Sequence, residues 1–161
     1  MKRLLLIPVL LLTTVSCQTK TTPIAAKTDK EMVQGEWVLA GFKTDPTATG
    51  NLTLNADNTF TGKIGSAKSK KPFNDSFSGT FVLSRTNMTG QNLLFIDLQI
   101  TTLSGKPAAS GMGMRFSYDP GNNILTDLLM MCYARPSEVN KVKKLLEDSR
   151  RAAQARRGPG K

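Results

Sequence analysis

Short runs in which apolar and polar residues alternate occupy most of the chain between residues 36 and 133. Within residues 52–64, every second position is apolar or glycine on both sides of the turn pair Asp57-Asn58. This period of two predicts strands with one buried face, joined in a hairpin. Seven or eight such strands predict a mainly β fold, an antiparallel barrel that is closed or nearly closed, because closure removes exposed strand edges. The other runs are 36–42, 77–84, 94–100, 114–118 and 124–133.

A helical period replaces the alternation after Pro136. Ser137 is a favoured N-cap residue, and the apolar residues that follow recur on one stripe. We therefore expect a C-terminal α-helix whose stripe packs on the sheet. Residues 32–154 are predicted to form one domain, followed by a disordered basic tail at 155–161. The stripe consists of Val139, Val142, Leu145, Leu146 and Ala153.

The first seventeen residues have the pattern of an export signal. Two basic residues precede an apolar run at 4–12, which is too short to span a bilayer, and small residues then lead to Cys17. This resembles a bacterial lipoprotein signal, in which residues 1–16 are removed and Cys17 carries lipid. The resemblance implies export and a lipid anchor in the cell envelope, and Gln18 resembles the pattern of lipoproteins passed on to the outer membrane. Residues 17–31 are expected to be a flexible tether.

The net charge of +10 is distributed unevenly. Residues 31–134 hold eight acidic and eight basic residues, whereas residues 135–161 hold three acidic and nine basic ones. A neutral body and export from the cytoplasm both argue against a nucleic-acid partner. The chain contains no histidine, which removes histidine-dependent nucleophilic catalysis and the usual zinc sites. No pair of carboxylates stands out by its spacing, so we expect no enzymatic activity, metal or cofactor.

The second cysteine, Cys132, has no disulfide partner if Cys17 is lipidated. A free thiol is usually buried, and a bond between two copies of the chain is the alternative. We expect a monomer with Cys132 buried.

Tryptophan occurs once in the chain, at Trp37 in Gly35-Glu36-Trp37, and Arg135 follows between the last predicted strand and the helix. This layout resembles the lipocalin family, in which such a tryptophan on the first strand packs under an arginine that follows the last strand. The resemblance implies a barrel closed by Trp37 and Arg135, with the cation over the indole face. It also implies a small apolar or amphipathic ligand inside, although the inward side chains could equally fill a solid core. The expected cavity residues are Phe60, Phe81, Met114, Phe116, Tyr118 and Met130.

Two further segments resemble the META domain of bacterial stress-related lipoproteins. They are Phe77-Ser78-Gly79-Thr80-Phe81 and Met130-Met131-Cys132, the second of which precedes the helix. The chain lacks that family's Gly-Cys-Asn and ends after the helix. This resemblance implies a structural or stress-response envelope module that acts through protein contacts and holds no ligand.

Overall fold

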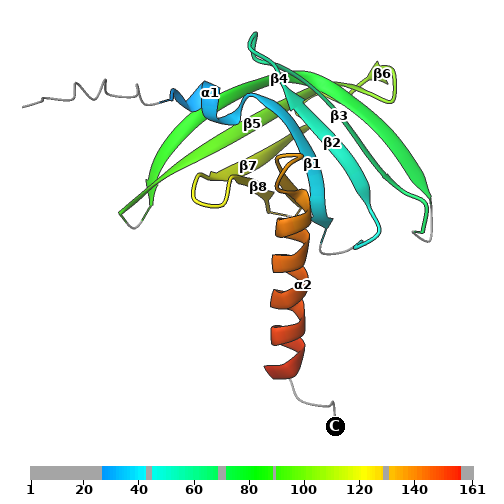
Figure 1. Ribbon diagram of the computed structural model, residues 1–161. Helices are drawn as coiled ribbons and strands as arrows, with labels where there is room; N and C mark the ends of the chain where they lie inside the picture. Colours follow the sequence, from blue (N-terminus) through cyan, green and yellow to red (C-terminus); the bar gives the residue numbers. More distant parts are fainter. Residues whose placement is uncertain (1–26, 43–44, 69–71, 89, 129–130, 157–161) are drawn as a thin grey trace, which may run out of the picture.

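The computed structural model describes residues 27–42, 45–68, 72–88, 90–128 and 131–156. Within these ranges, nine strands form one antiparallel sheet with a short helix before it and a long helix after it (Figure 1). The helices are α1 (Asp29–Val33) and α2 (Val139–Arg156). The strands are β1 (Gly35–Phe42), β2 (Thr49–Leu54), β3 (Thr59–Ser66), β4 (Phe73–Met88), β5 (Gln91–Leu103), β6 (Lys106–Pro107), β7 (Gly113–Asp119), β8 (Ile124–Asp127) and β9 (Met131–Ala134).

Eight of these strands close into a barrel. Their order is β4-β3-β2-β1-β9-β8-β7-β5, and pairing of β4 with β5 completes the ring. The remaining strand, β6, extends the sheet at the end of β5. The prediction of a mainly β fold, a seven- to eight-stranded antiparallel barrel with one C-terminal helix, is confirmed.

The main core lies inside the barrel, as the period of two predicts. Along β5, for example, Leu94, Ile96 and Leu98 are buried while Phe95 and Asp97 between them are half-buried. The inward rows of all eight barrel strands meet in one hydrophobic cluster. Its buried members are Val33, Trp37, Leu39, Leu52, Leu54, Phe60, Phe77, Phe81, Leu94, Ile96, Leu98, Phe116, Tyr118, Leu125, Met131 and Tyr133.

A second, smaller core lies between the outer wall and α2. Every residue of β9 is buried, because Met131 and Tyr133 face the barrel interior while Cys132 and Ala134 lie under the helix. The predicted run 124–133 is thus buried on both faces only in its last part, β9. The run is not one strand but two, β8 and β9, which pair as an antiparallel hairpin. From α2, Val142 joins this core.

Only part of the predicted helical stripe packs on the wall. Val139, Val142 and Leu146 do so, but the side chain of Leu145 is 52% exposed and Ala153 is exposed as well. A barrel wall is convex and touches a straight helix along a narrow line. The C-terminal part of α2 then extends past the strands (Figure 1), and the guanidinium of Arg150 donates to the carbonyl oxygen of Phe42 at the end of β1 (3.3 Å).

The N-terminal helix begins inside the segment that we expected to be a tether. The Thr28 hydroxyl accepts a hydrogen bond from the backbone N–H of Glu31 (3.3 Å), and the Glu31 carboxylate accepts one from the N–H of Thr28 (2.7 Å). This reciprocal pair is a capping box, which satisfies donors that the first turn leaves free. The folded region therefore starts before residue 32, where the predicted domain begins.

Candidate functional site

One end of the barrel, which we call the closed end, carries α1 together with Trp37 and Arg135. The Trp37 side chain is fully buried, and the guanidinium carbon of Arg135 lies 3.8 Å from the centre of its ring. The indole N–H donates to the carbonyl oxygen of Val33 in α1 (2.7 Å). The ring also meets Tyr118 edge-to-face, with centroids 6.0 Å apart. The structure thus brings together the two residues that the sequence paired across almost the whole domain.

The same guanidinium holds the turn between α1 and β1. It donates to the carbonyl oxygens of Met32 (2.6 Å), Gln34 (2.8 Å) and Glu36 (3.4 Å). Burial lowers the pKa of Arg135 from its ordinary value, yet a guanidinium remains charged at neutral pH. The planar group therefore stacks on the indole and satisfies backbone acceptors in one arrangement.

The glycine of Gly35-Glu36-Trp37 is required by this close approach. Gly35 has φ +108°, a conformation that side chains with a Cβ rarely adopt. A Cβ at this position would lie 3.0 Å from Nη1 of Arg135. Glycine, tryptophan and arginine therefore form one structural unit.

The helix α1 spans the closed end from β1 to β4. Val33 and Met32 contact the core, and Asp29 forms a hydrogen-bonded ion pair with Arg85 of β4. The Arg85 guanidinium lowers the pKa of the Asp29 carboxyl, chiefly through this hydrogen bond. The pair is partly exposed and adds little stability. Its role is to fix the position of α1 over the barrel end.

We expect Arg135→Lys to destabilise the protein by about 1–2 kcal/mol, because an ammonium can neither stack flat on the indole nor donate to three diverging carbonyls. Urea unfolding followed by Trp37 fluorescence measures this. Arg115→Lys is the matched control, because Arg115 also lies over an aromatic ring, Phe95, but is solvent-exposed. Equal losses in the two variants would contradict the prediction.

We call the opposite end of the barrel the far end. In an antiparallel barrel β1, β3 and β5 end there, while β2 and β7 begin there. Six apolar side chains at these positions contact the core but remain partly accessible. At the closed end Met32 and Leu83 are also partly accessible, but Val33 and Trp37 are fully buried. Farther out, Leu128 is 92% exposed just after β8. The partly buried residues of the far end are Phe42, Ala48, Ile64, Ile100, Leu103 and Met114.

The predicted cavity residues meet inside the barrel. Phe60, Phe81, Phe116 and Tyr118 are buried members of the main core, and Met114 packs against it from the far end. Met130 lies outside the described residues.

Two interior aromatic residues belong to predicted strands but not to the predicted cavity set, namely Phe77 and Tyr133. The Phe77 ring lies 6.0 Å from that of Phe60, and Tyr133 meets Phe116 edge-to-face at 5.6 Å. Phe77 lies four residues from Phe81 on the same alternating row, which was the available signal. Tyr133 lies at no such spacing from a predicted cavity residue.

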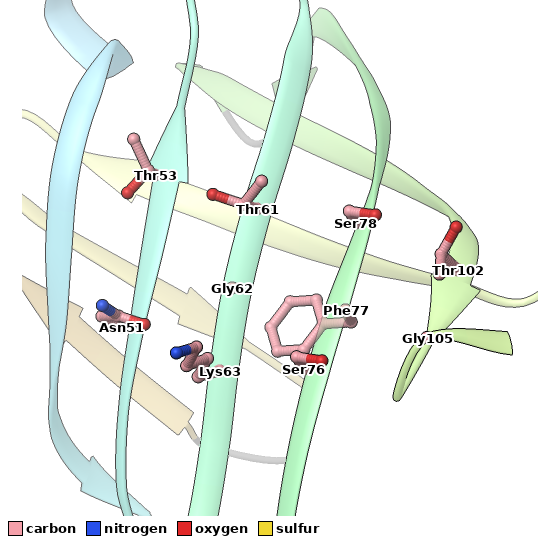
Figure 2. A pocket seen from close by; sticks show the side chains of 10 residues that line it. All are labelled: Asn51, Thr53, Thr61, Gly62, Lys63, Ser76, Phe77, Ser78, Thr102 and Gly105. Atoms are coloured by element: carbon pink, nitrogen blue, oxygen red, sulfur yellow. The ribbon is translucent and has the colours of Figure 1, made fainter.

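Figure 2 shows a surface hollow of about 350 Å³ on the outer side of β2, β3 and β4. Most of the residues that line it are polar and lie on the outward face of their strands, such as Thr53, Thr61 and Ser78. Phe77 contributes its ring beside Gly62, where no side chain covers it. At the closed end, a second hollow of about 530 Å³ includes Tyr118 among its lining residues.

Cys132 is a free thiol buried beneath α2. Burial raises its pKa to about 11, so the thiol is protonated at neutral pH. Within the described ranges, no three Cys, Asp or Glu side chains come together as a metal site. The described helices include none with the length and apolar character needed to cross a membrane.

Comparison with known proteins found no matching family model, no matching curated protein and no matching solved structure.

Proposed function

We propose that the protein is an envelope lipoprotein, anchored through lipid on Cys17, whose lipocalin-like barrel binds a small apolar or amphipathic ligand from the far end. The difference between the two barrel ends carries this proposal. The closed end has fully buried Trp37 beneath Arg135 and α1, whereas apolar side chains at the far end remain partly accessible. An apolar molecule that enters there would cover these side chains and gain the free energy of removing them from water.

The size and composition of the barrel support a small ligand. A barrel of eight strands is just wide enough for its own side chains or one small molecule. Its inner lining is largely aromatic and aliphatic, with Met114 at the far end. Methionine adapts its shape to irregular apolar neighbours, which suits a surface that must close with and without a ligand.

Thermal unfolding of the purified full-length protein tests ligand binding. The probes are 1-dodecanol, laurate and 1-monolauroylglycerol, each below its aggregation limit. We expect at least one probe to raise Tm in a concentration-dependent way, because a ligand that binds the native state stabilises it by mass action. Met114→Lys should weaken the effect, since it places a charge at the far end. Val82→Lys is the control, because Val82 is already exposed on the outer wall. Unchanged Tm with every probe would refute the ligand proposal.

The lipid anchor has a separate test. Intact-mass spectrometry of the protein extracted from envelopes should find a chain that begins at Cys17 and carries acyl groups. A free N-terminus at any other residue would refute the anchor without affecting the ligand proposal.

The density of aromatic side chains inside the barrel favours a second candidate, a META-like structural or stress-response module that acts through protein contacts. Three interior aromatic pairs lie within contact distance among the described residues, and such contacts are those of a filled core. In this case no probe raises Tm, and a crosslinker on Val82→Cys should capture one specific envelope partner. Capture of bulk envelope protein would count against this candidate.

A further inference from the structure

Tyr133 of β9 carries a polar group that the barrel leaves without a partner. Its side chain is fully buried, and its ring packs against Phe116. No described residue forms a hydrogen bond with its hydroxyl oxygen. Buried polar groups are nearly always satisfied, and one that is not lowers stability. Phenylalanine would fill the same space without this loss, so the hydroxyl calls for a partner from outside the fold.

A carboxylate lies diagonally across from this tyrosine. Tyr133 pairs with Leu125 of β8, and Asp127 is two residues farther along the same face of that strand. Asp127 also pairs with Phe116, another inward residue. Diagonal neighbours on one face are within reach of long side chains. The Asp127 carboxylate accepts a hydrogen bond from the backbone N–H of Met131 (2.7 Å).

The position of Asp127 places this polar pair on the far-end side of the barrel. Asp127 is the last residue of β8, which runs in the same direction as β1 and therefore ends at the far end. Toward the closed end, the neighbouring inward residues are apolar Leu125 and Phe116. A molecule that enters from the far end along β8 and β9 would thus meet this polar pair beside an apolar lining.

The charge of this region selects among head groups. Burial, and secondarily the negative charge of Asp127, raise the pKa of Tyr133, so its hydroxyl stays protonated and can donate. The same negative charge would repel a fatty carboxylate in this low-dielectric interior. An ammonium head would be attracted by Asp127, but it has no lone pair to accept the tyrosine hydrogen and would leave the Tyr133 hydroxyl unsatisfied. A neutral hydroxyl group can accept it without repulsion.

We propose that the Tyr133 hydroxyl is the hydrogen-bond donor to the head group of the ligand, and that the ligand is an uncharged, hydroxyl-bearing amphiphile of the monoacylglycerol or long-chain alcohol class. This inference rests on the proposed ligand-binding function. It adds the contact residue and the chemical class.

Tyr133→Phe in the full-length protein tests the inference, because it should have opposite effects on stability and binding. The ligand-free variant should unfold at a Tm about 2–5 °C higher than the unmodified protein, since an unsatisfied buried hydroxyl is removed. Its affinity for 1-monolauroylglycerol should fall about tenfold, the value of one lost hydrogen bond. The unmodified protein should bind 1-monolauroylglycerol more tightly than laurate.

Ser117→Ala is the matched control. Ser117 of β7 also carries a hydroxyl, but it lies on the outward face between Phe116 and Tyr118, and its hydroxyl is within hydrogen-bond distance of the backbone carbonyl oxygen of Thr126 (3.2 Å). This variant should not gain stability and should keep its affinity for 1-monolauroylglycerol.

Three outcomes overturn the inference while ligand binding itself stands. They are unchanged affinity in Tyr133→Phe, tighter binding of laurate than of 1-monolauroylglycerol, and a lower Tm of ligand-free Tyr133→Phe. The last would mean that the hydroxyl is already satisfied without a ligand. If no probe binds the unmodified protein, the proposed function fails and the inference fails with it.

Discussion

Trp37→Ala should lower the free energy of unfolding by about 3–5 kcal/mol, the usual loss for a fully buried tryptophan. The substitution empties the space between Tyr118 and Arg135 and removes the bond from the indole to the Val33 carbonyl. Arg135 would also lose the ring on which it stacks. Because native domains are stable by only about 5–15 kcal/mol, a large share of the stability depends on this residue.

Urea unfolding followed by far-UV circular dichroism measures this effect, since the variant has no tryptophan. Trp37→Phe should lose less, because it retains an aromatic ring under Arg135 and gives up the hydrogen bond to Val33. Val82→Ala serves as the surface control, because Val82 is 55% exposed on the outer wall, and should change the stability by less than about 0.5 kcal/mol. If Trp37→Ala cost no more than this control, the proposed role of Trp37 in the closed end would be wrong.

Gly79→Ala should cost about 3 kcal/mol or more, at the upper limit of overpacking effects. An added Cβ would lie 1.9 Å from the carbonyl oxygen of Gln99, which is backbone and cannot rotate away. The glycine sits where the pairing of β4 with β5 shifts register, between Ser78 and Gly79. Relief of the clash therefore requires the two strands to separate at the seam that closes the barrel.

Gly121→Ala is the matched control for this substitution. Its Cβ would lie 3.3 Å from a side-chain oxygen of Asp119, so a shift of a few tenths of an ångström in this turn relieves the contact. We expect a change within about 1 kcal/mol in the control, measured by the same urea titration. Equal stability of the two variants would contradict the proposed constraint at the β4–β5 seam.

The strands were predictable wherever an inward row alternates with outward polar residues. The hairpin of β2 and β3 follows this rule, as do the central parts of β4, β5 and β7. The rule failed at residues 85–92, which lie between two of the predicted runs and show no such alternation. There β4 and β5 continue as a paired ribbon up to Met88 and Gln91. Backbone hydrogen bonds hold such a ribbon whatever its side chains are, so polarity alone does not reveal it.

The boundary between β8 and β9 within the last apolar run was harder to predict. Residues 124–133 lack polar alternation because β9 is buried on both faces, by the core on one side and α2 on the other. Periodicity cannot locate a turn inside such a run. The helix α1 was overlooked although Thr28 and Glu31 have the capping-box spacing, because five residues are too few for a helical stripe.

The candidate site was predictable in part. Trp37 and Arg135 were recognised from their order along the chain, and their contact needed the tertiary structure to close β1 against β9. Tyr133 gave no signal of its own, because an unsatisfied hydroxyl exists only once every neighbour has taken its place.

The sequence by itself determined the strand-rich composition, the inward rows of the main strands, the C-terminal helix and the Gly35, Trp37 and Arg135 unit. These depend on local periodicity and residue type, which the chain carries directly. The tertiary structure decided the closure through β4 and β5, the different character of the two barrel ends and the isolation of the Tyr133 hydroxyl. Such features arise from contacts between residues far apart in the sequence, and their geometry exists only after the ring of strands has closed.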